Sequence, residues 1–114
     1  IATGVMVNEA MAAAEALEQE GVSLRVIDMH TIKPIDKDII VKAAKETKGI
    51  VTAEEHSVFG GLGSAVAEVV VTSCMTKMSF VGLQDTFGES GKPAELMTKY
   101  GLTSEAIIAA VKSL

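Results

Sequence analysis

Apolar and polar residues follow two patterns along the chain: short apolar runs, and longer segments in which apolar residues recur every three to four positions. The short runs predict strands. They lie at 1–4, 23–29, 49–53 and 80–83. The longer stripes predict amphipathic helices between them. These lie at 7–20, at 37–48 after an Asp36 cap, at 61–73, at 93–100, and after a Thr103 cap.

Regular alternation of strands and helices predicts right-handed βαβ units, and therefore a mainly parallel sheet with helices on both faces. We expect a three-layer α/β/α fold in which residues 1–114 form a single domain. The expected strand order is 2-1-3-4, with a topological switch point between strands 1 and 3. Ligands of such sheets bind beyond the carboxyl ends at the switch point. Here that crevice would be lined by Thr3, Gly4 and 54–63.

The glycine-rich stretch T-A-E-E-H-S-V-F-G-G-L-G-S at 52–64 is the first candidate for a ligand-binding loop. A dinucleotide fingerprint follows the first strand of a fold, whereas this loop follows the third. Glu54 and Glu55 precede the turn and would repel a phosphate, opposing the attraction of the helix N-terminus. We interpret Gly60 and Gly61 as a sharp turn and Gly63 as a point of close helix–sheet packing.

The charged residues beside this loop do not form an obvious catalytic set. Glu54 and Glu55 are adjacent on a strand and so point to opposite faces. His56 has no nucleophile near it in the sequence, which favours a hydrogen bond to a loop or a place at a subunit contact. Asp28 and His30 face one side, but two ligands do not make a metal site, and a structural hydrogen bond is the preferred interpretation.

A second glycine-containing stretch, D-T-F-G-E-S-G-K at 85–92, fails the phosphate-loop pattern. That pattern requires a glycine five positions before the Gly-Lys pair, and a Ser or Thr after it. Position 86 is a threonine, and Pro93 follows the lysine. We therefore expect no phosphate loop there.

Composition restricts the function further. The net charge is −5 with a single arginine, Arg25, which argues against nucleic-acid binding. The lone Cys74 cannot form an internal disulfide, no secretory signal is visible, and no apolar run approaches the ~20 residues of a membrane span. We expect a cytoplasmic protein without membrane contacts. The chain begins inside an expected strand, so we interpret it as a piece of a longer protein.

Several motifs occur in an order that resembles the C-terminal domain of transketolase-type, thiamine-diphosphate-dependent enzymes. They are I-A-T-G at 1–4, D-M-H-T-I-K-P-I-D at 28–36, E-E-H-S-V-F-G-G-L-G-S-A-V-A-E at 54–68, F-G-E-S-G at 87–91 and Y-G-L at 100–102. The resemblance covers essentially the whole chain. It is closer to a transketolase C-terminal section than to a 2-oxoacid dehydrogenase β subunit or deoxyxylulose-phosphate synthase, which remain alternative parents.

The resemblance implies a non-catalytic domain whose parent transfers a two-carbon ketol unit between sugar phosphates. Thiamine diphosphate and a divalent metal such as Mg²⁺ would be held by other domains, so no catalytic, cofactor-binding or metal-binding residue is expected in this chain. The partners would be the remaining transketolase domains or subunit, in a homodimeric parent. The family's additional antiparallel edge strand is missing ahead of 1–4, which would leave the edge beside 23–29 uncovered.

Two functions of different classes follow from these observations. The first is a scaffold, in which the possible interface loop comprises Glu54, Glu55, His56, Gly60, Gly61 and Gly63. The second is a regulatory module that binds a small anion or nucleotide with the same loop, at the switch point. A phosphoacceptor receiver domain fits the strand order less well, because its first strand would need to end in acidic residues and here ends in Thr3-Gly4.

Overall fold

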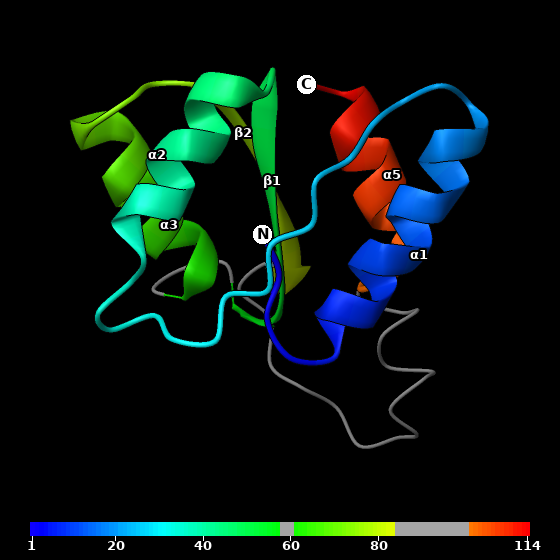
Figure 1. Cartoon of the computed structure of the whole chain (residues 1–114). Coiled ribbons are helices and arrows are strands. Elements are labelled where there is room, and N and C mark those ends of the chain that lie inside the picture. The colour runs from blue at the N-terminus through cyan, green and yellow to red at the C-terminus, as the bar shows by residue number, and fades with distance from the viewer. Residues whose placement is uncertain (58–60, 84–100) are drawn as a thin grey trace.

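The computed structural model describes residues 1–57, 61–83 and 101–114, and shows a sheet between two pairs of helices (Figure 1). The elements are α1 (Met6–Gln19), α2 (Lys37–Glu46), β1 (Gly49–Ser57), α3 (Leu62–Thr72), β2 (Lys77–Leu83) and α5 (Ser104–Lys112). Helices α2 and α3 lie on one side of the parallel strands β1 and β2, and α1 and α5 lie on the other. The predicted α/β/α arrangement is confirmed.

The helix ends follow the local chemistry that the sequence predicts. The Asp36 side chain accepts a hydrogen bond from the Ile39 N–H at 3.2 Å, and so caps the first turn of α2. Thr103 caps α5 by accepting from the Ala106 N–H. Gly21, which follows α1, has a φ of 80°, a left-handed conformation that favours glycine. The helix predicted at 93–100 lies outside the described residues.

Both faces of the sheet are buried under apolar side chains. On the side of α2 and α3, Ile50 packs with Ile40, Leu62, Val66 and their neighbours. On the other side, Ala53 packs with α1 and α5, and Val51 lies partly buried against the same cluster. Burial on two faces explains why β1 begins as a continuous apolar run instead of an alternating one.

The two predicted strands at 1–4 and 23–29 are wrong in extent. Ala2 alone forms parallel bridges, one to Asp28 and one to Ala53. The Ala2 N–H donates to the Ile27 carbonyl and the Ala2 carbonyl accepts from Met29, both at 2.9 Å. Ile1 and Ala2 lie beside only the end of the 23–29 segment, so the residues before Ile27 form no β-ladder hydrogen bonds with them. The complete 2-1-3-4 order therefore stays a prediction.

The strands β1 and β2 are longer than the apolar runs suggest. Strand β1 continues past Ala53 to Ser57, and β2 begins at Lys77, three residues before the predicted start. Their parallel register pairs Gly49 with Lys77 and Ala53 with Val81, and it becomes irregular between Ala53 and Ser57. Backbone pairing with a neighbour thus extends a strand into polar sequence that hydropathy alone does not identify.

Helix α3 lies close to the sheet at Gly63. A Cβ atom at this position would lie 2.7 Å from Cδ1 of Phe80 and 3.1 Å from Oγ1 of Thr52. Real Cβ atoms essentially never approach other atoms as closely as the first of these distances. The close helix–sheet packing predicted for Gly63 is therefore confirmed.

We expect Gly63→Ala to lower the free energy of unfolding by about 1–3 kcal/mol, because the added methyl group overpacks the contact with Phe80. This loss would outweigh the gain of about 0.5–1 kcal/mol that alanine normally gives in a helix. Urea unfolding followed by circular dichroism measures the change. Introducing Gly63→Ala together with Phe80→Ala should remove most of the penalty, relative to Phe80→Ala alone. An equal cost in both backgrounds would contradict this explanation.

Candidate functional site

The centre of the candidate site is the carboxylate of Glu54, near the end of β1. This side chain is only 1% exposed to solvent. Its Oε1 accepts a hydrogen bond from the Leu62 N–H at 2.9 Å, and its Oε2 accepts one from the Gly63 N–H at 2.7 Å. Glu54 thereby joins the end of the strand to the first turn of α3.

These two hydrogen bonds fall where a helix N-terminus lacks hydrogen-bond acceptors. The first N–H groups of a helix have no partner within it, and they carry a partial positive charge. Helix α3 begins after Gly61, which has no side chain to act as a cap. A buried carboxylate that accepts hydrogen bonds from two of these N–H groups gives the helix its missing acceptors and gains two donors for itself. Hydrogen bonds to a carboxylate are stronger than hydrogen bonds between neutral groups.

This arrangement sharpens the interpretation of the glycine-rich loop. We predicted that Glu54 and Glu55 would repel a phosphate from the helix N-terminus. In the structure, the Glu54 carboxylate occupies the place of the anion, since it holds the N–H groups of Leu62 and Gly63. The loop therefore resembles an anion site whose acceptor is supplied by the protein itself.

The other predicted members of this site lie elsewhere or outside the described side chains. The Glu55 carboxylate lies near Gly4, at the start of α1, where its Oε1 would be 3.1 Å from a Cβ atom on Gly4. The two glutamates thus have different neighbours, as predicted for adjacent residues of a strand. Gly61 precedes α3. Gly60 and the side chain of His56 lie outside what the structure describes.

Thr52 is a buried polar residue that the sequence analysis did not single out. It is fully buried, and its Oγ1 has no hydrogen-bond partner among the described residues. Thr52 and Glu54 are two positions apart on β1 and so share the face that α3 covers. The sequence pattern that could have identified this buried residue is the pair of polar residues at alternate positions, T-x-E at 52–54, directly after the apolar residues 50–51.

A second helix N-terminus also receives an internal carboxylate. Glu9 on α1 accepts a hydrogen bond through Oε2 from the Ser104 N–H at 2.8 Å. It lies at the first turn of α5, which Thr103 also caps. Because 95 positions separate Glu9 from Ser104 in the chain, no local sequence pattern indicates this contact.

The side chains of Asp28 and His30 lie close together but do not form a hydrogen bond with each other, and a structural hydrogen bond to the following loop stays a prediction. The Oδ2 atom of Asp28 lies 3.7 Å from Nε2 of His30, and both side chains are exposed. A contact between two exposed side chains contributes little to stability. Within residues 1–57, 61–83 and 101–114, no three His, Cys, Asp or Glu side chains gather as a possible metal site.

The described helices are also too short or too polar to cross a bilayer. Cys74 is a free thiol of intermediate burial.

Comparison with known proteins identifies relatives over nearly the whole chain. Residues 1–107 match the family model described as the transketolase C-terminal domain. A 6-deoxy-6-sulfo-D-fructose transketolase subunit from a Clostridium species is 44% identical over 96% of this chain and 34% of its own length. Rat transketolase is 44% identical over 100% of this chain and 18% of its own length.

A solved structure and a more distant relative agree with these matches. The structure, described as a split gene transketolase in an inactive beta4 tetramer, superposes with a TM-score of 0.94. It is 50% identical and covers 98% of this chain and 37% of its own. A 1-deoxy-D-xylulose-5-phosphate synthase from Desulforudis audaxviator is 38% identical. The chain thus spans about a third or less of the length of the proteins it matches.

We expect Glu54→Ala to lower the free energy of unfolding by about 2–4 kcal/mol, because it leaves two buried N–H groups without an acceptor. Glu54→Gln keeps one acceptor oxygen and should cost about 1–3 kcal/mol. Urea unfolding at neutral pH measures both. The matched control is Glu55→Gln, which removes the neighbouring charge without touching α3. Equal losses for Glu54→Gln and Glu55→Gln would contradict the assigned role.

Inorganic phosphate should not bind saturably at the N-terminus of α3 up to millimolar concentration, because Glu54 already occupies its N–H groups. The measurement is the amide chemical shift of Leu62 and Gly63 during a phosphate titration, with sodium chloride at matched ionic strength as the control. A saturable shift at both amides, absent in chloride, would favour the regulatory anion-binding function instead.

Proposed function

We propose that this chain, which belongs to the transketolase C-terminal domain family, acts as a non-catalytic scaffold within a larger transketolase-like enzyme. The parent enzyme would transfer a two-carbon ketol unit between sugar phosphates. The domain would contribute assembly, with the stretch 54–63 facing a neighbouring domain or subunit.

The observation that carries this proposal is the buried bridge from Glu54 to α3. It fixes both described ends of the glycine-rich stretch, since β1 contributes the carboxylate and α3 contributes the N–H groups. The Glu54 end and the Leu62 end are thus held in one place relative to the sheet. Fixed ends of this kind suit a docking contact, because little conformational entropy is lost there when a partner binds.

The chemistry of the described residues supports placing the cofactor elsewhere in the parent. A diphosphate with a divalent cation needs free helix N–H groups or basic residues, together with a cluster of oxygen ligands. The N–H groups of α3 are occupied, and no metal-binding cluster gathers among the described side chains. We therefore assign thiamine diphosphate and its Mg²⁺ to the remaining domains, and no reaction step to these residues.

The names of the relatives guide the choice of partners. The Clostridium relative is called a subunit, and the solved structure comes from a split gene. They favour a parent in which this domain and the remaining domains can lie on separate chains. We propose that the assembled parent is homodimeric in its active form and cytoplasmic. Deoxyxylulose-phosphate synthase stays an alternative parent, supported by the match to one such enzyme, as does a 2-oxoacid dehydrogenase β subunit.

Complementation tests the scaffolding role. Deleting the segment equivalent to 1–114 from the full-length parent should disrupt its assembly and, as a consequence, its ketol transfer, and adding the separate chain should restore both. Light scattering measures the mass of the assembly, and a coupled assay measures transfer between sugar phosphates. An unrelated domain of similar size and charge serves as the control.

Two results would contradict the proposal in different ways. A deleted parent that stays assembled and active would show that the domain is dispensable. A deleted parent that keeps its normal assembly and substrate binding, but loses transfer, would instead indicate a direct role in the chemistry.

A further inference from the structure

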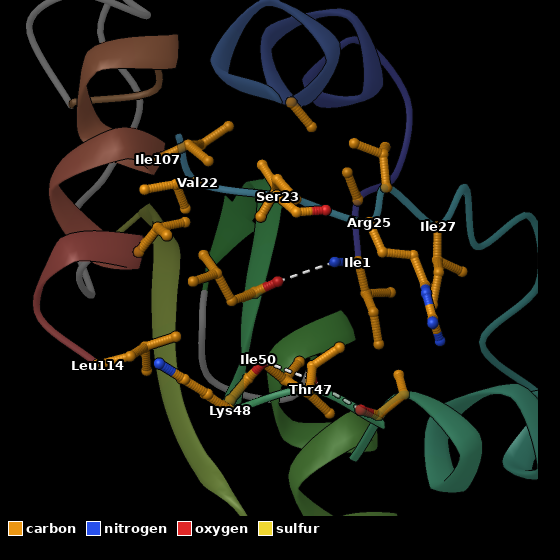
Figure 2. Close-up of a pocket in the computed structure, with 18 of the residues that line it drawn as sticks. Ile1, Val22, Ser23, Arg25, Ile27, Thr47, Lys48, Ile50, Ile107 and Leu114 are labelled. Atoms are coloured by element: carbon orange, nitrogen blue, oxygen red, sulfur yellow. Dashed lines mark hydrogen bonds between the residues drawn. The ribbon is translucent and has the colours of Figure 1, made fainter. Parts of the chain in front are cut away.

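A groove of about 880 Å³ runs along the exposed side of α1, beside the segment 21–24. Its apolar lining includes Met11 and Val22, which are 55% and 37% exposed. The same segment also borders a second hollow, of about 800 Å³, where Figure 2 labels Val22, Ser23 and Arg25. Two large apolar side chains of the groove are thus left to solvent.

Glu15 and Glu18 give the groove an acidic rim. Met11, Glu15 and Glu18 recur at intervals of four and three residues, so they share one face of α1. Both glutamates are exposed. Arg25, the next cation along the chain, pairs instead with Glu46 at 3.2 Å. In the part of the chain that the structure describes, no ion pair reaches either glutamate of the rim, so the rim keeps its negative charge.

Helix α2 presents the opposite charge on its exposed side. Lys42 and Lys45 are exposed and three positions apart, which is also the spacing of the two glutamates. Ile39 lies three positions before Lys42 and is 36% exposed. The acidic residues of this helix are Asp38 and Glu46, and Glu46 pairs with an arginine. Among the described residues, no ion pair joins either lysine to a carboxylate, so both charges are available to a partner.

The groove and the lysines of α2 match in chemistry but lie on opposite sides of the molecule. Helices α1 and α2 cover opposite faces of the sheet, so the groove cannot meet the lysines of its own chain (Figure 1). It can meet those of a second copy. On a helix, side chains three positions apart project from one face and lie about 5–6 Å apart. The two lysines can therefore face the two glutamates at once, and Ile39 can cover part of the exposed apolar lining.

We infer that the groove on α1 docks helix α2 of a second copy of this chain, with Lys42 and Lys45 facing Glu15 and Glu18. Charge favours this occupant over a purely apolar segment, because a partner without cations would leave the acidic rim uncompensated. The contact joins two different surfaces, so in a pair of copies one groove and one helix stay free, and further copies add to form a ring or an open chain. It uses none of residues 54–63, so it goes beyond the proposed scaffold function and does not depend on it.

A dilution series of the 114-residue chain tests the contact directly. Amide chemical shifts are recorded from about 10 µM to about 1 mM, a range that detects weak association. The amides of Met11 and Val22 on one surface, and those of Ile39 and Lys42 on the other, should shift together with one dissociation constant. Raising the salt concentration from about 0.05 M to about 0.5 M should weaken the association, because exposed charges become screened.

Charge reversal tests the pairing of the two surfaces. Glu15→Lys with Glu18→Lys, and separately Lys42→Glu with Lys45→Glu, should each raise the dissociation constant at least about tenfold, because like charges then face each other. An equimolar mixture of the two variants should associate again with close to the original affinity, since each reversed surface meets its complement.

The matched control is Glu68→Lys with Glu105→Lys, which changes the net charge equally at exposed positions outside both surfaces and should associate as the unmodified chain does. Shifts on both surfaces that disappear in each reversed variant and return in the mixture support the inference. A chain that shows no shift up to about 1 mM would overturn it, as would shifts on one surface only or association that reversal leaves unchanged. If circular dichroism shows that a reversed variant is unfolded, the dilution series of the unmodified chain decides alone.

Discussion

The contact between the Glu54 carboxylate and the N–H groups of Leu62 and Gly63 is the constraint on which the site depends. A glutamate that is 1% exposed is costly to bury unless its charge finds strong partners. The helix N-terminus provides them, and the helix gains its cap from the same two bonds. The buried carboxylate and the uncapped helix N-terminus would each be destabilising without the other. The end of β1 and the start of α3 therefore depend on each other.

Glycine at position 63 makes this contact possible. Only a residue without Cβ lets α3 approach Phe80 and Thr52 at the observed distance, and that approach accompanies the bond from the Gly63 N–H to Glu54. A glycine-rich stretch between a strand and a helix is typical of phosphate-binding loops, yet here it serves internal packing and internal capping. The motif alone does not distinguish these roles, whereas a buried acidic residue at the preceding strand end does.

The sequence predicted the layers, most helix bounds and two caps because those features depend on local chemistry, such as the Asp36 side chain beside the Ile39 N–H. Predictions failed where the structure depends on contacts between residues that are distant in the sequence. The segment 23–29 has the composition of a strand but only one bridge, because strand formation also requires a neighbour along its length. Similarly, only the tertiary fold brings Glu9 to Ser104. The burial of the Thr52 hydroxyl was indicated by nothing except its place in an alternating pattern.

The position of Glu54 has a consequence for motion as well as for structure. Separating α3 from the sheet would take the Glu54 carboxylate from both of its N–H donors, and it would leave those two amides without an acceptor at the same moment. Neither half of the contact gains anything by opening alone. We therefore expect the end of strand β1 and the start of helix α3 to open together, as one cooperative unit of local unfolding.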